Sequence, residues 1–289
     1  MNKEFLDLAE QLKSSVSCTV RLNELMSGHT SFKIGGPADI LVLPESIEQL
    51  REVLKVVKET VVPLTLLGNG SNVLVRDKGI RGIVIKLGNM LRHFYEAEDL
   101  LVFGSGYSLA LASYKAMECG RTGMEFAVGI PGSIGGAVYM NAGAYDGEMQ
   151  NIVNCVKVMD LQGNERVLTA EELNFGYRKT SLQNSGLIVT EVTLKMPSGN
   201  KDEIKSKMDD FSHRRISKQP LEMPSAGSMF KRPPGYFAGT LIDQAGLKGY
   251  TVGGAQISTK HAGFVVNVGG ATAADVLPVS YTHLRAHET

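Results

Sequence analysis

Cysteine is scarce in this chain of 289 residues, where only Cys18, Cys119 and Cys155 occur. Their number is odd, they lie far apart and they form no C-x-x-C pair, which excludes a disulfide framework and a cysteine-based zinc site. We therefore expect the three thiols to be reduced and structural, as in a cytoplasmic protein.

The chain also lacks a net charge, a long apolar run and a signal-peptide core. Its 30 Lys and Arg residues balance its 30 Asp and Glu residues, so no overall field favours nucleic acid or an anionic membrane as a partner. No apolar run approaches membrane-spanning length, and residues 1–12 alternate apolar and charged side chains at helical spacing. These absences indicate a globular protein that acts on small molecules.

The usual nucleotide and metal motifs are missing as well. Neither glycine-rich segment ends in Gly-Lys-Ser/Thr, so the chain has no P-loop. The segment 68–73 has the first two glycines of a Rossmann fingerprint and lacks the third. The six histidines form no H-E-x-x-H motif and no close pair with carboxylates, so we expect no catalytic metal.

What the sequence does contain is glycine, in two loop-like segments. The run Gly129–Tyr145 is rich in glycine, and Gly68–Asn72 repeats the pattern after the strand-like run 61–67. Glycine allows positive φ and has no Cβ, so successive N–H groups can converge on a pyrophosphate. We predict one long, diphosphate-containing ligand. We also expect that a Cβ at Gly70 or Gly135 would intrude between the backbone and this diphosphate.

The apolar patterning predicts an α+β fold and not a doubly wound parallel sheet. In the first part of the chain, Ser46 is expected to cap a helix over 47–58. The other elements expected there are a helix over 1–12, a glycine turn followed by a strand within 31–43, and strands over 61–67, 73–75 and 82–87. A second part begins near Leu100, with a strand over 100–103, a helix over 108–119, and strands near 153–161 and 187–196.

The pattern breaks at Pro197–Asn200, which marks the predicted start of a third part. A strongly charged helix over 202–215 follows, and then a helix over 238–245 and a strand over 263–268. Ser228, in a stretch of small residues, and Arg178, beside a lysine, would each by itself be assigned to a turn or to solvated surface.

Six segments, taken together and in order, resemble one family closely. Each is weakly specific alone, and the combination is highly specific. They are 30–36 (TSFKIGG), 68–74 (GNGSNVL), 129–136 (GIPGSIGG), 175–178 (FGYR), 226–231 (AGSMFK) and 241–249 (LIDQAGLKG). Over roughly residues 15–277 the chain is thus similar to the UDP-N-acetylenolpyruvoylglucosamine reductases, flavoenzymes of peptidoglycan precursor synthesis. The short connection from Arg178 to Gly186 resembles the second type of this family, which lacks a tyrosine-bearing loop.

The resemblance implies a vanillyl-alcohol-oxidase-like (PCMH-type) FAD-binding region over 1–197, made of two α/β subdomains, about 1–90 and 91–197. A smaller α+β substrate-binding domain would occupy 198–277. FAD is expected to be held without a covalent bond, because neither glycine loop contains a histidine. The cofactor-binding residues that the resemblance implies are Ile34, Gly35, Gly36, Gly68, Asn69, Gly70, Ser71, Asn72, Gly129, Ile130, Pro131, Gly132, Ser133, Ile134 and Gly135.

The reaction that the resemblance implies has two halves. NADPH reduces the flavin, and an enolpyruvyl sugar nucleotide then takes the hydride and becomes UDP-N-acetylmuramate. Ser228 matches the family's proton donor, since even a weak acid can protonate a carbanion when it is well positioned. Arg178 matches the arginine that stabilises charge on the substrate carboxylate. Tyr177, Lys231 and Arg232 are expected to contact the substrate.

One departure from the family pattern lies at the end of the sequence. Residues 271–277 match and residues 278–289 do not, so the family's catalytic glutamate has no counterpart, and its role is not assigned to Glu288. We expect Pro278 to break the helix that should continue there. The tail is predicted to be foreign sequence, the substrate domain incomplete and the reductase cycle impaired.

Two other functions are compatible with the same residues. An FAD oxidase of this fold would act on an alcohol or hydroxy acid, and rapid reoxidation of its flavin by oxygen would favour it. A non-catalytic flavin or sugar-nucleotide binder is the second alternative, favoured by flavin reduction without turnover. The sequence leaves the oligomeric state open.

Overall fold

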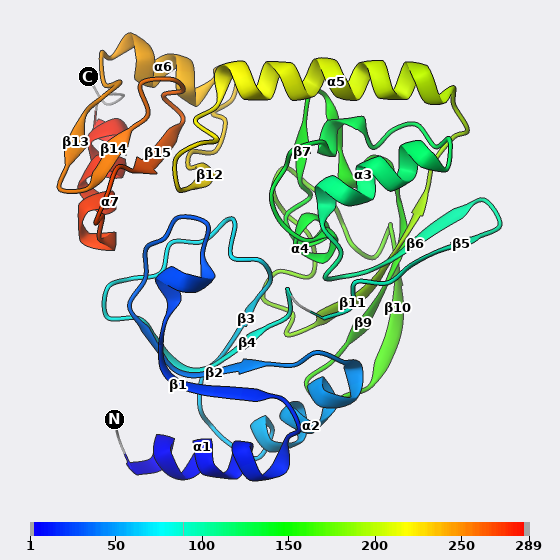
Figure 1. Cartoon of the computed structure of the whole chain (residues 1–289), viewed down its shortest axis with the longest axis vertical. Helices are drawn as coiled ribbons and strands as arrows, with labels where there is room; N and C mark the ends of the chain where they lie inside the picture. Colours follow the sequence, from blue (N-terminus) through cyan, green and yellow to red (C-terminus); the bar gives the residue numbers. More distant parts are fainter. Residues whose placement is uncertain (1–2, 89, 286–289) are drawn as a thin grey trace. The chain divides into compact units, whose positions relative to one another are not determined.

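The structure is a computed structural model that describes residues 3–88 and 90–285 (Figure 1). Its contacts form two compact units. Unit 1 comprises Met1–Leu22, Ile40–Asn69 and Gly82–His213, and unit 2 comprises Asn23–Asp39, Gly70–Arg81 and Arg214–Thr289. These units divide the chain at other points than the predicted domain limits near residues 90 and 197, which stay predictions. Within the described ranges, none of the helices combines the length and apolar character that crossing a bilayer requires.

Unit 1 contains most of a four-stranded sheet and the two helices that cover it (Figure 1). The strands are β1 (Thr19–Leu25), β2 (Pro37–Leu43), β3 (Leu64–Leu67) and β4 (Ile80–Lys86), in the order β1-β2-β4-β3, with β3 parallel to β4. The helices are α1 (Lys3–Ser15) and α2 (Ile47–Val57). Their apolar faces bury Leu12, Leu50 and Leu54 against the sheet residues Ile40 and Ile85.

A second sheet of unit 1 has five antiparallel strands in the order β10-β9-β11-β6-β5. These strands are β5 (Phe94–Ala97), β6 (Leu100–Gly104), β9 (Val153–Met159), β10 (Glu165–Thr169) and β11 (Ile188–Lys195). The other elements around it are α3 (Leu109–Glu118), η2 (Glu125–Ala127), α4 (Ile134–Tyr139), the hairpin β7 (Gly143–Ala144) and β8 (Gly147–Glu148), and η3 (Met149–Asn151). Its core includes Phe103, Ile134, Val138 and Val192, all without solvent exposure.

Unit 2 is built on a small sheet in the order β12-β15-β14-β13. The strands are β12 (Ser225–Ser228), β13 (Thr251–Val252), β14 (Ala255–Ile257) and β15 (Phe264–Asn267), and the helical elements are η1 (Met26–His29), α6 (Ala238–Gln244) and α7 (Ala273–Arg285). Its core joins Phe32 and Ile34 to Ile242, Val265 and Val276. The long helix α5 (Lys201–Lys218) begins in unit 1 and ends in unit 2.

The predicted α+β class is confirmed, and so are most of the predicted elements. The hydroxyl of Ser46 accepts a hydrogen bond from the Gln49 N–H at 3.2 Å and so caps α2, as predicted. The predicted strand over 73–75 is wrong: these residues form no strand, and Val75 packs instead against Gly35, where a Cβ would lie 2.9 Å from the Val75 Cβ. The run 61–67 is a strand only from Leu64 onward.

The expectation that Pro278 breaks the last helix is wrong as well. Helix α7 runs from Ala273 through Pro278 to Arg285. A proline inside a helix costs about 3 kcal/mol, whereas each fully buried valine contributes about 1.5–3 kcal/mol. Val276 and Val279 are both buried in the unit 2 core, which offsets the cost of the proline. Glu288 lies outside the described residues, and the foreign origin of the tail stays a prediction.

The first turn of α7 is held by a carboxylate from a distant segment of unit 2. Oδ1 of Asp77 accepts the N–H of Ala273 at 2.7 Å, and Oδ2 accepts the N–H of Ala274 at 2.9 Å. A helix leaves the N–H groups of its first turn without partners inside the helix, and a negative charge there also favours the helix dipole. Asp77 therefore ties residues 70–81 to the C-terminal helix.

We predict that Asp77→Ala lowers the free energy of unfolding by about 1–2 kcal/mol, because two N–H groups of α7 lose their acceptors. Asp77→Asn keeps one acceptor oxygen and should lose less. Urea unfolding followed by circular dichroism measures both changes, and Lys78→Ala, at an exposed neighbouring position, serves as the control. Wild-type stability of Asp77→Ala would contradict the assignment.

Candidate functional site

Parts of the two glycine loops predicted from the sequence lie side by side in unit 1, namely Gly68 at the start of the first loop and Ser133 in the second. Gly68 follows β3, and Ser133 precedes α4. A Cβ on Gly68 would lie only 3.3 Å from the Ser133 hydroxyl oxygen. That hydroxyl accepts the N–H of Gly136 at 3.3 Å and caps α4. The structure thus brings two segments together that are more than sixty positions apart in the chain.

A third glycine turn, which the sequence reasoning missed, supports the second loop. It is Gly104–Tyr107, directly after β6. The Ser105 carbonyl accepts the N–H of Gly135 at 2.9 Å, and the Tyr107 carbonyl accepts the N–H of Ile134 at 2.9 Å. The spacing Gly-x-Gly after a strand, the same as in Gly68-Asn69-Gly70, was the signal that could have identified this turn.

The glycine loop before α4 presents backbone donors. The N–H groups of Gly129, Gly132 and Ser133 donate no hydrogen bond to any residue within 3–88 and 90–285. Gly129 and Gly132 have φ of 71° and 130°, values that favour glycine. Adjacent N–H groups without internal acceptors form an anion site. This donor set fits the diphosphate of FAD.

The reason for glycine at two predicted cofactor positions differs from the one expected. A Cβ on Gly135 would lie 2.7 Å from the Ser105 Cβ, and a Cβ on Gly70 would overlap the carbonyl oxygen of His29. Each of these Cβ atoms would therefore point at atoms of the protein itself. Gly70 and Gly135 are therefore required by the packing of backbone on backbone, and the expectation that their Cβ atoms would meet the diphosphate first is corrected.

A bulge in the second sheet determines where Ser105 lies. The register between β9 and β11 shifts between Val189 and Glu191. The residue in the shift, Thr190, accepts the N–H of Ser105 at 3.0 Å through its carbonyl. Its hydroxyl donates to the Lys157 carbonyl at 3.1 Å. The position of the glycine loop before α4 therefore depends on this bulge through two consecutive backbone hydrogen bonds, from Ser105 to Thr190 and from Gly135 to Ser105.

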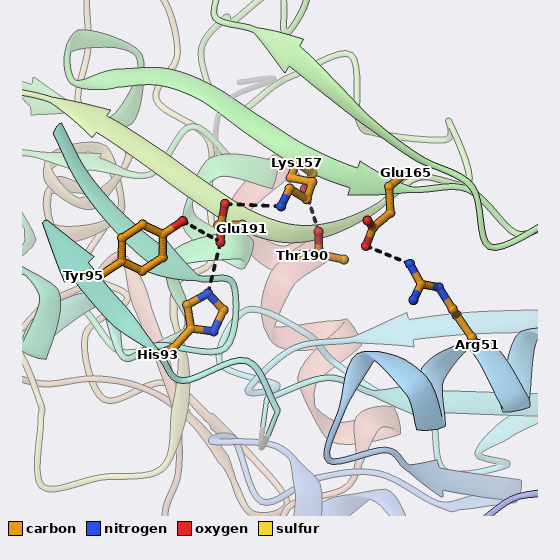
Figure 2. Close-up of polar contacts among 7 residues, drawn as sticks. All are labelled: Arg51, His93, Tyr95, Lys157, Glu165, Thr190 and Glu191. Atoms are coloured by element: carbon orange, nitrogen blue, oxygen red, sulfur yellow. Dashed lines mark hydrogen bonds and ion pairs between the residues drawn. The ribbon is translucent and has the colours of Figure 1, made fainter. Parts of the chain in front are cut away.

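The next residue, Glu191, is the centre of a polar cluster that holds the bulge (Figure 2). Its carboxylate accepts the Tyr95 hydroxyl at 3.3 Å, lies 3.2 Å from Nε2 of His93, and lies 3.7 Å from Nζ of Lys157. Loss of solvent around Tyr95, and then the Glu191 charge, raise the pKa of the Tyr95 hydroxyl above its ordinary value. Tyr95 therefore stays protonated and remains a hydrogen-bond donor to Glu191.

Other predicted cofactor residues have different surroundings. The side chains of Ile34 and Ile134 are buried in the cores of unit 2 and unit 1, so only their backbone can face a ligand. In unit 2 the Gly70 carbonyl accepts the N–H of Ser31 at 3.0 Å, which joins the segments around Ile34–Gly36 and Gly70–Asn72. Among the remaining predicted positions, four are buried, namely Gly36, Gly70, Ser133 and Gly135. The others are partly or fully exposed.

Arg178 lies in a tight turn closed by two backbone hydrogen bonds between Gly176 and Lys179. Its backbone is left-handed, with φ of 55°. Its guanidinium donates to the carbonyl of Asn141 at 3.1 Å and to the carbonyl of Gly143 at 2.9 Å. The guanidinium carbon lies 5.3 Å from the centre of the exposed Tyr177 ring. The charge is therefore held in place by backbone groups and one aromatic face.

Asn141, which the sequence reasoning did not single out, organises this region. It has no solvent exposure, and its φ is 41°. Its amide nitrogen donates to the Gly176 carbonyl and to Glu148, both at 3.1 Å, and its amide oxygen accepts the N–H of Gln150 at 3.0 Å. A buried amide with this many partners fixes the turn that carries Arg178.

Ser228 ends β12 in unit 2, and its side chain is exposed. It pairs with Phe264 of β15, and the next residue, Met229, donates its N–H to the Gly263 carbonyl at 2.9 Å. Lys231 and Arg232 follow on the surface, with the Arg232 guanidinium 3.8 Å from the centre of the Phe237 ring. The predicted proton donor thus stands at the end of a paired strand, beside two cations.

Comparison with known families gives two matches along the chain. Residues 38–169 match the FAD binding domain family. Residues 219–282 match the family described as UDP-N-acetylenolpyruvoylglucosamine reductase, C-terminal domain. The first match contains both glycine loops, and the second contains Ser228.

Curated relatives and a solved structure agree with these matches. The chain is 50% identical over 262 residues to a UDP-N-acetylenolpyruvoylglucosamine reductase of Clostridioides difficile, covering 91% of the chain and 86% of the relative. It is 51% identical over 276 residues to the reductase of Clostridium perfringens, covering 96% and 90%. The crystal structure of the Thermus caldophilus reductase matches with a TM-score of 0.81 and 39% identity, covering 93% of this chain and 95% of that one.

We predict that Gly135→Ala weakens FAD binding and also lowers the melting temperature of the FAD-free protein. The new Cβ would overlap Ser105, and overpacking of this kind costs about 1–3 kcal/mol. Gly136→Ala is a matched variant in the same helix, because its Cβ would meet only the Ser133 hydroxyl, at 3.3 Å. It should leave the FAD-free melting temperature unchanged or higher, since alanine favours helix.

The two variants separate packing from ligand contact. Differential scanning fluorimetry with and without FAD, together with flavin titration, gives both quantities. If Gly135→Ala lost FAD affinity at an unchanged FAD-free melting temperature, contact with the ligand and not with Ser105 would explain the glycine.

Proposed function

The chain belongs to the UDP-N-acetylenolpyruvoylglucosamine reductases, FAD-dependent oxidoreductases of peptidoglycan precursor synthesis, and from this premise we propose that it reduces UDP-N-acetylglucosamine enolpyruvate to UDP-N-acetylmuramate with NADPH. The observation that carries the proposal is the donor set of the glycine loop at Gly129–Ser133, joined in one chain to an exposed Ser228. A cytoplasmic location follows from the same premise.

Bound FAD would supply the hydride carrier between NADPH and the substrate. The N–H groups of Gly129, Gly132 and Ser133 would hold its diphosphate, with Gly68 beside Ser133. The resemblance extends this set to Ile34–Gly36 and to Asn69–Asn72. We propose non-covalent binding, because the two glycine loops contain no histidine.

Ser228 is proposed to protonate the carbon next to the substrate carboxylate. A serine hydroxyl is a weak acid, and it can act here only because hydride addition makes that carbon strongly basic. The exposed side chain at the end of β12 is accessible to a substrate. The pairing of Ser228 with Phe264 and the Met229 hydrogen bond restrict its backbone, which keeps the hydroxyl in one place.

Arg178 is proposed to stabilise the negative charge that develops on the substrate carboxylate during the same step. An arginine has five N–H donors, and the two bonds to Asn141 and Gly143 use two of them. The remaining donors can pair with a carboxylate in the planar, two-point arrangement that guanidinium favours. The role therefore needs no movement of the side chain.

Three further residues are proposed to bind the substrate, namely Tyr177, Lys231 and Arg232. All are exposed, and the two cations suit the phosphates of a sugar nucleotide. The nine residues between Arg178 and β11 contain turns and irregular structure, without a helix or a further strand. This short connection supports the proposal that the chain is of the second type, without the tyrosine-bearing loop.

We predict that Ser228→Ala leaves reduction of the flavin by NADPH nearly intact and slows reoxidation by the enolpyruvyl substrate about a hundredfold or more, as expected when a positioned proton donor is removed. Stopped-flow absorbance of the flavin measures the two half-reactions separately. Ser225→Ala, on the same strand, is the control and should change neither rate. Equal slowing of both halves by Ser228→Ala would mean that Ser228 only shapes the site.

Arg178→Ala should act on the same half-reaction. Loss of a preorganised cation removes roughly 3 kcal/mol of transition-state stabilisation. A variant that slowed flavin reduction instead would place Arg178 in the binding of NADPH.

A further inference from the structure

A compact turn in unit 2 runs beside Ser228. It connects β14 to β15 and comprises residues 258–263. The hydroxyl of Ser258, which is buried, accepts the N–H groups of Lys260 at 3.1 Å and of His261 at 3.2 Å. The His261 carbonyl accepts the N–H of Phe264 at 3.0 Å. These bonds fix the turn, and with it the orientation of the His261 ring.

The His261 ring acts as a hydrogen-bond acceptor. Its Nδ1 accepts the N–H of Gly263 at 3.1 Å, which requires a neutral imidazole with its proton on Nε2. The ring also packs edge-on against Phe264, with ring centres 5.1 Å apart. On its other side it lies near α6, where a Cβ on Gly239 would be 3.2 Å from the His261 Cε1.

Gly263 stands between this ring and the Ser228 hydroxyl. A Cβ on Gly263 would lie 3.2 Å from Nδ1 of His261 and 3.3 Å from the Ser228 hydroxyl oxygen. The backbone of Gly263 is not left-handed, so its conformation does not require glycine. Glycine is favoured here because a Cβ would be crowded by His261 and Ser228. Its carbonyl accepts the N–H of Met229, the residue after Ser228. One peptide segment thus links the imidazole to the end of β12.

The charges that face His261 favour its neutral form. Burial lowers the pKa of His261 below its ordinary value; a backbone hydrogen bond of His261 opposes this shift, and the charges of Lys248 and Lys218 reinforce it. Lys248 follows α6 and pairs with Asp243 at 2.7 Å, and Lys218 belongs to the end of α5. In its own turn, Lys260 pairs with Glu222 at 3.8 Å.

We propose that His261 is a positioning residue for Ser228. The neutral imidazole holds the Gly263 N–H, Gly263 holds the Met229 N–H, and the end of β12 thereby presents the serine hydroxyl at a fixed place. His261 itself need not touch the substrate. The proposal rests on the proposed role of Ser228 as proton donor, and it adds a residue and a direction of pH dependence to that role.

Protonation of His261 would break the chain of contacts. A protonated imidazole is a donor at both nitrogens and cannot accept from Gly263. Because the pKa of His261 is lowered, the contact is intact near neutral pH and is lost as the pH falls through that lowered value. The rate that depends on Ser228 should fall on this acidic side.

Two substitutions test the proposal in the full chain with FAD bound. His261→Asn keeps an acceptor, because its Oδ1 is as many bonds from Cα as Nδ1 is in histidine. His261→Leu removes the acceptor at similar volume. We expect the leucine variant to slow flavin reoxidation by substrate about tenfold, mainly in kcat and not in KM, and the asparagine variant to stay within about twofold of wild type and to lose the acidic limb of the pH profile. Lys260→Ala is the control.

A second measurement does not depend on turnover. In protein labelled with ¹⁵N-glycine and ¹⁵N-methionine, the amide signals of Gly263 and Met229 should shift together as His261 titrates, and both should move in His261→Leu. If the Met229 amide signal did not shift as His261 titrates, or if the asparagine variant were as slow as the leucine variant, the proposal would be wrong.

The double variant Ser228→Ala with His261→Leu separates this proposal from the proposed function. If His261 acts through Ser228, the double variant should be no slower than Ser228→Ala alone. If the rate loss of the double variant were the product of the losses of the two single variants, the positioning role of His261 would be wrong, and the role of Ser228 as proton donor would stand. If Ser228→Ala alone did not slow reoxidation, the proposed role of the serine itself would fail.

Discussion

The hydrogen bond from the Gly135 N–H to the Ser105 carbonyl, 2.9 Å long, is the contact on which the glycine loop before α4 depends. It brings the start of α4 directly against the end of β6. Such an approach of two backbones is possible only because residue 135 has no Cβ, which would otherwise lie 2.7 Å from the Ser105 Cβ. Ser105 is in turn fixed by its own N–H, which donates to Thr190 in the bulge of β11.

This arrangement explains how the loop can present donors without help from side chains. The turn after β6 holds Ile134 and Gly135 at the C-terminal end of the loop, and Ser133 caps α4 at the same end, so the loop backbone is fixed where it enters the helix. Ser133 is 5% exposed, and within the described residues its N–H has no acceptor. A buried donor without a partner costs about 1–3 kcal/mol. An anionic group that supplies the acceptor recovers this cost, which is a physical reason for a ligand to bind there.

The elements that the sequence predicted well are those whose causes are local. Ser46 and Ser108 cap helices with their own hydroxyl groups, and apolar spacing marks the buried faces of α2 and α3. The features that were missed depend on distant partners. The carboxylate of Asp77 binds N–H groups 196 and 197 positions away, and the bulge at Thr190 exists only through the register between β9 and β11. The register between two strands cannot be predicted from the periodicity of either strand alone.

In the candidate site, too, the features with local causes were predictable and those that depend on distant partners were not. The glycine loops were visible as composition, yet the reason for Gly135 lay in Ser105, thirty positions earlier. Asn141 carries no catalytic chemistry and attracts no motif, although it fixes the turn of Arg178. Pro278 does not end helix α7, because the burial of Val279, which offsets the cost of the proline, is a property of the folded unit and not of the local sequence.

Arg178 shows what such supporting residues contribute to chemistry. Its side chain would lose rotamer entropy if it had to find its orientation only when the substrate binds. Here the carbonyl groups of Asn141 and Gly143 fix it beforehand, and the left-handed backbone directs it toward them. A lysine at this position would keep the charge and lose the planar fork that makes two carbonyl bonds and still offers donors. Charge stabilisation is most effective when the dipoles need no rearrangement during the reaction. In the role proposed for Arg178, the buried amide of Asn141 would therefore matter as much as the guanidinium whose turn it holds.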